Sequence, residues 1–326
     1  MVNLEVSKGI ESKMTGAGVI PSVAGGTATL PIASVPLPGE IKKSWLRRVA
    51  PCLAFLAAFS TAMALLLIWS EAAAQRRQAF DANMTRDYVF GVSMDNPQLV
   101  AYIREMHFKK PSNLELHNIT ETPEEKFLVN FFKSKRDGVY LEYINHAGAI
   151  STSSWLEAYY GWRGLLVLTD FRSFFEACKS YRNPRTRALH ACLSTDKDTK
   201  EITYHQESEV RVTKLSEGPN SLIFSDEGLP TMRLKCFPLY SVLLAYNQTA
   251  IDYFNLDSID SSDSQVLDTI PWDVIRISVL SIRTSNHQSE ADVRSLIDKL
   301  SARRYKLVNT TDTGKLIFTY SRLLKI

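Results

Sequence analysis

Acidic side chains near the ends of two strand-like runs are the groups of this 326-residue chain best placed to do chemistry. Glu142 lies in the run at residues 139–144, and Asp257 follows the run at 253–256. A carboxylate at such a position could act as a general acid or base, or bind a ligand beyond the carboxyl ends of the strands. His146, in the same turn as Glu142, could bind a ligand or respond to pH, although an ordinary hydrogen-bonded histidine is the favoured interpretation.

Two other groupings of ligand-type residues are weaker. Asp196 and Asp198 form a DxD pattern that could hold a metal and a nucleotide-sugar diphosphate, but a solvated loop between two strands is favoured. His190 and Cys192 face the same side of a strand-like run, as zinc ligands would. Without a CxxC pair or a second close histidine, core packing or a disulfide is favoured there.

Alternating strand and helix patterns must position these residues. Strand-like runs lie at residues 139–144, 165–168, 188–193, 201–205, 253–256 and 274–282. Helical patterns lie at residues 97–108, 123–135, 153–160, 172–181, 239–246, 263–269 and 290–303. The runs at 305–308 and 315–320 predict an antiparallel hairpin, and residues 206–230 predict an irregular insertion. The alternation predicts an α/β fold with a mostly parallel sheet and helices on both faces.

The segment 137–166, continued by Pro271-Trp272 and the strand at 279–282, resembles the FkbM-type methyltransferase domain. The resemblance covers about residues 97–322. It implies a class I methyltransferase-like (Rossmann-type) sheet that ends in the antiparallel hairpin. It also implies an S-adenosylmethionine pocket built by Glu142, Ile144, Ala147, Gly148, Leu168 and Asp257.

Several of these positions depart from the family pattern. The family places glycine where this chain has Ile144, because the backbone must approach the cofactor closely, and aspartate where it has Ala147. The second strand should end in a carboxylate for the ribose hydroxyls, yet it ends in Leu168; Asp170 would replace that carboxylate only in a shifted register. Arg283 stands where a later strand should end in an acid. We therefore expect a vestigial pocket with no catalytic residue, no cofactor and no metal.

The uncharged run at residues 49–69 is long enough to span a membrane. About 21 residues at 1.5 Å each give roughly 31 Å of helix, against a hydrocarbon core of about 30 Å. Lys42, Lys43, Arg47 and Arg48 lie just before it, whereas Arg76 and Arg77 lie farther away on the other side. This asymmetry predicts a cytoplasmic N-terminus and a single-pass type II signal-anchor protein.

The chain thus divides into four predicted parts. They are a flexible cytoplasmic tail (1–48), a transmembrane helix (49–69), a lumenal stem with short helices (70–121) and a methyltransferase-like domain (122–326). Charged residues make up 22% and hydrophobic residues 45%, ordinary globular values that exclude wholesale disorder. The net charge of +3 lies entirely in the tail, so the neutral remainder gives no reason to expect nucleic acid as a partner.

Glycosylation sequons and cysteines lie on the predicted lumenal side. The sequons begin at Asn83, Asn118, Asn247 and Asn309. The cysteines there are Cys178, Cys192 and Cys236. They allow at most one internal disulfide and leave one thiol free, buried or paired with another chain.

The order of short tail, single span and this domain is similar to the Star family of insect membrane proteins. This resemblance implies a protein of the endoplasmic reticulum and Golgi membrane with its domain in the lumen. It implies a partner as well as the lipid bilayer: transmembrane precursors of epidermal growth factor receptor ligands, whose export to the Golgi it would promote without enzyme activity. The alternative is an S-adenosylmethionine-dependent O-methyltransferase of a lumenal glycan or lipid.

Overall fold

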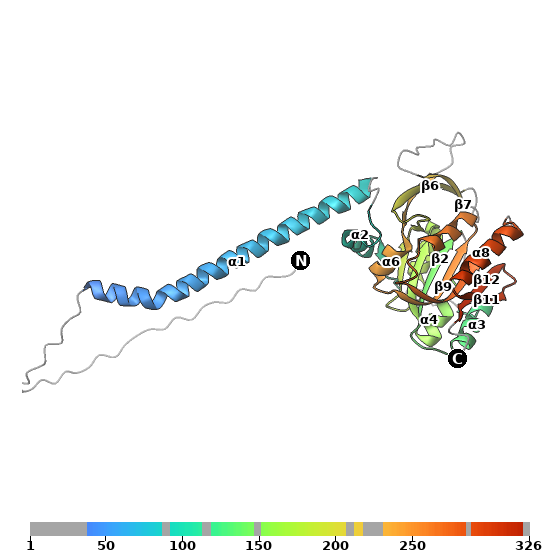
Figure 1. Ribbon diagram of the computed structural model, residues 1–326, viewed down its shortest axis with the longest axis horizontal. Helices are drawn as coiled ribbons and strands as arrows, with labels where there is room; N and C mark the ends of the chain where they lie inside the picture. The colour runs from blue at the N-terminus through green and yellow to red at the C-terminus, as the bar shows by residue number, and fades with distance from the viewer. Residues whose placement is uncertain are drawn as a thin grey trace, which may run out of the picture. The chain divides into compact units, whose positions relative to one another are not determined.

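The computed structural model describes residues 38–86, 92–112, 119–146, 151–206, 212–217, 231–284 and 288–321. The chain forms two compact units, Met1–Trp69 and Ser70–Ile326. Helix α1 (Pro38–Arg86) contains the boundary between them (Figure 1). Within it, Val49–Met84 has a mean hydropathy of 2.2 in its most apolar stretch, none of which is buried. Among the described residues this is the one helix that is long and apolar enough to cross a membrane.

An eight-stranded sheet forms the centre of the second unit, in the order β1-β4-β3-β2-β9-β10-β12-β11. The strands are β1 (Phe108–Lys109), β2 (Val139–Asn145), β3 (Arg163–Leu168), β4 (Arg187–His190), β9 (Ala250–Ser258), β10 (Arg276–Arg283), β11 (Tyr305–Thr310) and β12 (Lys315–Tyr320). Neighbours from β4 to β10 pair in parallel, whereas β1, β12 and β11 are antiparallel to their neighbours. The predicted α/β fold with a mostly parallel sheet is confirmed.

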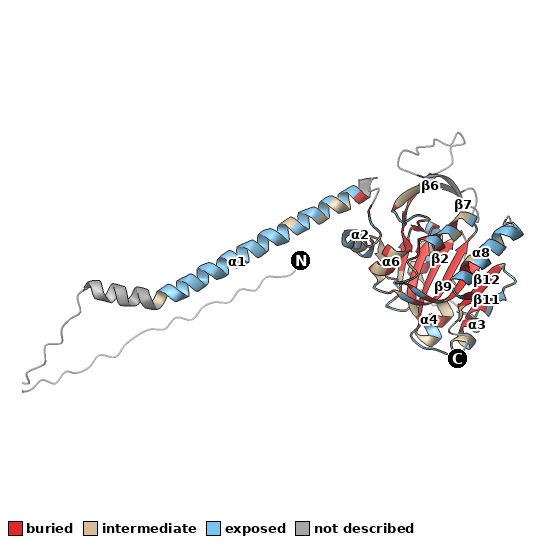
Figure 2. Cartoon of the chain, viewed as in Figure 1, coloured by how far each residue is buried: buried red, intermediate tan, exposed pale blue. Residues whose placement is uncertain are grey.

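Helices cover both faces of this sheet, whose strands form the buried centre (Figure 2). They are α2 (Pro97–Tyr102) with a π-helical turn (Ile103–His107), α3 (Pro123–Phe131), α4 (Ser154–Tyr160), α5 (Phe171–Lys179), α6 (Leu239–Tyr246), a 3-10 turn (Ser261–Gln265) with α7 (Val266–Thr269), and α8 (Glu290–Ala302). One core cluster joins α3, α4 and α5 to the sheet, and the other joins α2, α6, α7 and α8. Because side chains alternate along a strand, β2 sends Ile144 into the first cluster and Tyr143 into the second.

A second, four-stranded sheet includes part of the predicted irregular insertion. Its strands are β5 (Cys192–Leu193), β6 (Lys200–Gln206), β7 (Val212–Glu217) and β8 (Thr231–Phe237), in the order β5-β8-β6-β7. The prediction for residues 206–230 was therefore wrong where β7 forms; 207–211 and 218–230 lie outside the described residues. The run predicted as one strand at 188–193 is also divided, because β4 belongs to the large sheet and β5 to the small one.

A disulfide joins β5 to β8 in the small sheet. It links Cys192 to Cys236, which are register partners with Cα atoms 4.3 Å apart. Cys178, at the end of α5, is free and half-buried. The sulfur of Cys192 is therefore held in a disulfide and is not a thiolate that could join His190 as a zinc ligand.

Replacing Cys192 with serine should lower the free energy of unfolding of the Ser70–Ile326 unit by about 2–4 kcal/mol. The bridge closes a sequence separation of 44 residues and so restricts the unfolded chain. Urea unfolding of the secreted unit, followed by tryptophan fluorescence, measures the loss. Cys178→Ser is the matched control: Cys178 is half-buried beside the core and forms no disulfide, so the loss should be smaller, about 1 kcal/mol or less. Equal losses in the two variants would contradict the assignment of the bridge.

Candidate functional site

The candidate site lies at the carboxyl ends of the parallel strands, where the strand order reverses. The chain runs from β2 to β3 and β4 on one side, and returns to β9 and β10 on the other. Ligands of open α/β sheets bind at such a switch point. Glu142 of β2 and Asp257 of β9 both lie here, and Asp257 is the register partner of Ile144. The fold thus brings together residues that the sequence analysis singled out more than 100 positions apart.

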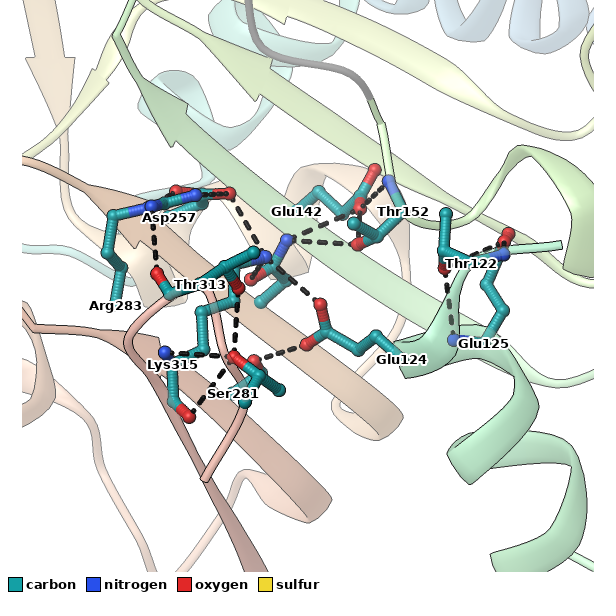
Figure 3. A network of polar contacts seen from close by, with 12 residues as sticks. Thr122, Glu124, Glu125, Glu142, Thr152, Asp257, Ser281, Arg283, Thr313 and Lys315 are labelled. Atoms are coloured by element: carbon teal, nitrogen blue, oxygen red, sulfur yellow. Dashed lines mark hydrogen bonds and ion pairs between the residues drawn. The ribbon is translucent and has the colours of Figure 1, made fainter. Parts of the chain in front are cut away.

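Asp257 lies among three basic side chains (Figure 3 draws two of these pairs). Its Oδ1 is 3.0 Å from Nε2 of His146 and accepts a hydrogen bond from Nε of Arg283, while its Oδ2 is 3.0 Å from Nζ of Lys315. Burial raises the pKa of Asp257, but the hydrogen bonds from His146 and Arg283 and the charge of Lys315 lower it by more, so the pKa lies below its usual range. Because an ionised carboxylate only accepts, Nε2 of His146 carries the proton in this contact.

Lys315 connects Asp257 to a second buried carboxylate. Lys315 is only 3% exposed. Its Nζ lies 3.1 Å from Oε2 of Glu124 and 3.2 Å from Oδ1 of Asn255. Burial lowers the pKa of Lys315, whereas the charges of Glu124 and Asp257 raise it by more, so the ammonium group remains charged. The lysine therefore holds together a helix, a central strand and the final hairpin.

The first turn of α3 aims Glu124 into this network. Thr122 and Glu125 form a capping box: Glu125 N donates to Oγ1 of Thr122 at 3.1 Å, and the Glu125 carboxylate accepts from Thr122 N at 2.9 Å. Fixed in this way, Glu124 accepts hydrogen bonds from the hydroxyls of Tyr253, at 2.6 Å, and Ser281. A carboxylate at a helix N-terminus is also stabilised by the helix dipole.

Glu142 is completely buried and bound by the segment that follows the turn. Its carboxylate accepts from the backbone N and Oγ1 of Thr152 at 2.8 and 2.6 Å and from Oγ of Ser153 at 2.9 Å. Asn255 donates to Oγ1 of Thr152 at 3.1 Å while its own carbonyl accepts from Lys315, so it links Glu142 to the charged cluster. The carboxylate oxygens of Glu142 thus already accept hydrogen bonds from within the chain, and a cofactor would have to displace these donors.

Ile144 and Leu168 belong to the hydrophobic core. They are register partners on β2 and β3, only 1% and 3% exposed, and cluster with Leu128 of α3. Neither can do what the family resemblance expects at its position, which is to leave room for the cofactor or to accept hydrogen bonds from ribose. Asp170 caps α5 instead, because its Oδ2 accepts from the backbone N and Oγ of Ser173, both at 2.8 Å.

Other residues from the sequence analysis are scattered. Ala147, Gly148 and Asn118 lie outside the described residues. The remaining sequon asparagines are exposed on α1, at the C-cap of α6 and on β11; they are Asn83, Asn247 and Asn309.

Three members of the network escaped the sequence analysis: Glu124, Asn255 and Lys315. In the sequence, Glu124 has the pattern of an ordinary acidic residue in the first turn of a helix. Asn255 has the pattern of a polar residue in a strand. Of the three, Lys315 alone has a sequence pattern that could have indicated a buried charge. It is the first residue of a predicted strand and is followed by the apolar run Leu-Ile-Phe. A lysine there points either to an edge or to a buried partner.

A small cavity lies at the same strand ends, on the Tyr143 side of β2. It has a volume of about 40 Å³ and is bordered by the disulfide, by Asn145 and by Asp263. Ligand pockets usually measure about 300–1,000 Å³. This space can hold ordered water but is far too small for a nucleoside cofactor.

The described part of the chain offers no group of three or more His, Cys, Asp or Glu side chains placed to hold a metal ion. The charged groups of the site instead neutralise one another, so that a ligand would have to displace an internal partner. A scan against models of protein families, a search of curated proteins and a search of solved structures each gave no match. The function must therefore be inferred from the geometry of the site.

Replacing Asp257 with asparagine should destabilise the Ser70–Ile326 unit by about 3–5 kcal/mol at pH 7, since it removes a buried carboxylate that offsets the charges of Lys315 and Arg283. The pKa of Asp257 is lower in the folded state than in the unfolded chain, so its stabilisation is present above about pH 4 and is lost as the pH falls further. The penalty of the substitution should therefore shrink by about 1 kcal/mol between pH 5 and pH 3. Urea unfolding of both proteins at each pH measures it.

Asp137→Asn is the matched control, because Asp137 also pairs with an arginine, Arg185, at 2.8 Å, but with both side chains more than half exposed. An exposed pair contributes about 0–1 kcal/mol. A penalty for Asp257→Asn that stays the same from pH 5 to pH 3 would show that the carboxylate is not held ionised by its partners.

Proposed function

We propose that this chain is a membrane-anchored, methyltransferase-like protein that transfers no methyl group and acts as a cargo-binding factor in the secretory pathway. One observation carries the proposal: Arg283 and Lys315 both pair with Asp257 where S-adenosylmethionine would have to bind. The mostly parallel sheet with its final antiparallel hairpin supports a class I methyltransferase-like fold.

The energetics of the site argue against cofactor binding. Displacing one partner of a buried ion pair costs about 3–5 kcal/mol, which corresponds to roughly two to four orders of magnitude in a dissociation constant. The cofactor would also have to displace Ile144 from the core, and at Leu168 it would find no acceptor for its ribose hydroxyls. The free-energy costs at Asp257, Ile144 and Leu168 add to one another, because the three residues would face different parts of the cofactor.

Two features support a lumenal position for the Ser70–Ile326 unit. A disulfide such as Cys192–Cys236 persists in oxidising compartments and is rare in the cytosol. The sequon asparagines Asn83, Asn247 and Asn309 are all exposed, as an attached glycan requires. Both agree with the orientation expected from the basic residues before the apolar helix.

An exposed aromatic surface supports a role in binding proteins. Helices α4 and α5 cover the same face of the sheet and present Tyr159, Phe171 and Phe175, which are 58%, 51% and 49% exposed. Aromatic side chains are enriched in protein–protein interfaces, where they contribute large contact areas. We call these three residues the aromatic surface.

The resemblance to the Star family suggests which cargo to test: transmembrane precursors of epidermal growth factor receptor ligands, carried from the endoplasmic reticulum to the Golgi. A membrane anchor on both partners confines them to two dimensions and raises their effective concentration, so a weak contact suffices. The competing function is an S-adenosylmethionine-dependent O-methyltransferase of a lumenal glycan or lipid, for which the buried Glu142 and Asp257 are the retained family residues.

Calorimetric titration of the purified Ser70–Ile326 unit should detect no binding of S-adenosylmethionine or S-adenosylhomocysteine, with a dissociation constant above about 1 mM. The pocket is filled by Ile144 and by the ion pairs of Asp257. A cooperative urea transition of the same sample shows that the protein is folded. Micromolar affinity for either compound would overturn the inactive-site proposal and place the methyltransferase first.

Removing the gene should leave the growth-factor precursors in the endoplasmic reticulum, as measured by the fraction whose glycans stay sensitive to endoglycosidase H. Restoring the full chain should restore export, whereas a Phe171→Ser, Phe175→Ser variant should restore it several-fold less, because it lacks two anchors of the aromatic surface. Ile259→Ser, Val274→Ser is the matched control, since these apolar residues are about as exposed (42% and 44%) and lie in loops outside α4 and α5. Normal export without the gene would refute the trafficking role.

A further inference from the structure

Strand β11 forms an open edge of the large sheet. It is the last strand in the sheet order and pairs only with β12 among the described strands. Five of its six residues are exposed, and Leu307 and Val308 are each 39% exposed. An edge with apolar side chains and unpaired backbone groups is a template for pairing with a strand of another molecule.

The strand carries two partial safeguards. Its register shifts between Leu307 and Asn309, so that Val308 is an extra residue in a β-bulge. Lys306 adds a positive charge to the same edge. A bulge and a lysine are common devices against edge pairing. Neither removes the adjoining apolar pair Leu307-Val308.

We propose that an N-linked glycan on Asn309 covers the β11 edge and keeps the Ser70–Ile326 unit from pairing with a second copy of itself. Asn309-Thr310-Thr311 is a sequon whose asparagine lies in the exposed strand, directly after Leu307-Val308. A glycan is bulky and strongly hydrated, so it blocks the approach of another strand. The proposal rests on the lumenal position proposed above, because glycans are added only on that side of the membrane.

The geometry of Asn309 fits this role. Its Oδ1 accepts from Thr310 N at 2.9 Å, and Nδ2, the atom that is glycosylated, donates no hydrogen bond to any described residue. In the transfer, Nδ2 forms a bond to the anomeric carbon of a lipid-diphosphate-linked oligosaccharide and loses one proton, while the bond from that carbon to the diphosphate oxygen breaks. The lipid diphosphate is the leaving group.

The other described sequons lie on different elements. Asn247 ends α6 in the left-handed conformation, with φ of 58°, and Asn83 lies within helix α1. Neither belongs to a strand, so a glycan at either position would protect no sheet edge. Asn247 is therefore a matched control that differs from Asn309 in location but not in chemistry.

The full chain is produced in a eukaryotic secretory cell, purified in detergent, and compared with Asn309→Gln and Asn247→Gln variants. Mass spectrometry of glycopeptides should find a glycan on Asn309. Sedimentation velocity should show that Asn309→Gln lowers the apparent dissociation constant for self-association by about tenfold or more, whereas Asn247→Gln leaves it unchanged. Thermal unfolding of each variant verifies that the substitution has not disturbed the fold.

A second substitution identifies the surface involved. Adding Val308→Lys to Asn309→Gln should restore the weak association of the wild type, because a charge at the bulge blocks strand pairing. Trimming the wild-type glycan with an endoglycosidase should increase association without any substitution. The first result would assign the effect to the β11 edge, and the second would assign it to the glycan rather than to the substitution.

Each remaining outcome is decisive. A glycan on Asn247 with none on Asn309 would overturn the proposal and leave the lumenal orientation intact. A glycan on Asn309 whose removal does not change association would overturn its protective role alone. If none of the sequons carried a glycan, the lumenal orientation of the proposed function would fail together with this proposal.

Discussion

The buried ion cluster around Asp257 is the interaction on which the rest of the site depends. Two carboxylates, Asp257 and Glu124, share the ammonium group of Lys315, and Arg283 closes the cluster from the neighbouring strand. Removing ions from water is unfavourable, and their attraction offsets that only when every member is present. One arrangement of β9, β10, β12 and the start of α3 therefore satisfies the cluster. Any other arrangement would leave a buried charge without its partner.

The same constraint bears on ligand binding at these strand ends. A carboxylate that faces a pocket is unfavourable without its ligand, whereas one that faces Arg283 and Lys315 is satisfied at all times. Arg283 and Lys315 therefore keep Asp257 within the buried interior rather than available to a ligand. Ile144 and Leu168 add to this effect, since both are packed into the core beside the strand ends.

Local patterns in the sequence predicted most of the architecture and little of the network. The capping box at Thr122 and the apolar runs of the central strands depend on neighbouring residues, and the structure contains both. The bond between Lys315 and Glu124 joins residues 191 positions apart, and no local pattern encodes such a pair. Strand β8 was missed although apolar and polar residues alternate from Met232 to Cys236, because the preceding polar stretch suggested a loop.

Because the polar side chains of the site bind one another, the proposed function relies on the exposed surface and on the apolar helix. The segment Val49–Met84 has 36 residues, or about 54 Å of helix, which exceeds a hydrocarbon core of about 30 Å. The helix is therefore longer than a bilayer requires, and its charged part begins near Glu71 and Arg76. The proposed cargo-binding function needs one exposed face that binds the partner and other exposed faces that do not associate. The proposed protection of the β11 edge and the exposed aromatic surface would each meet one of these two needs.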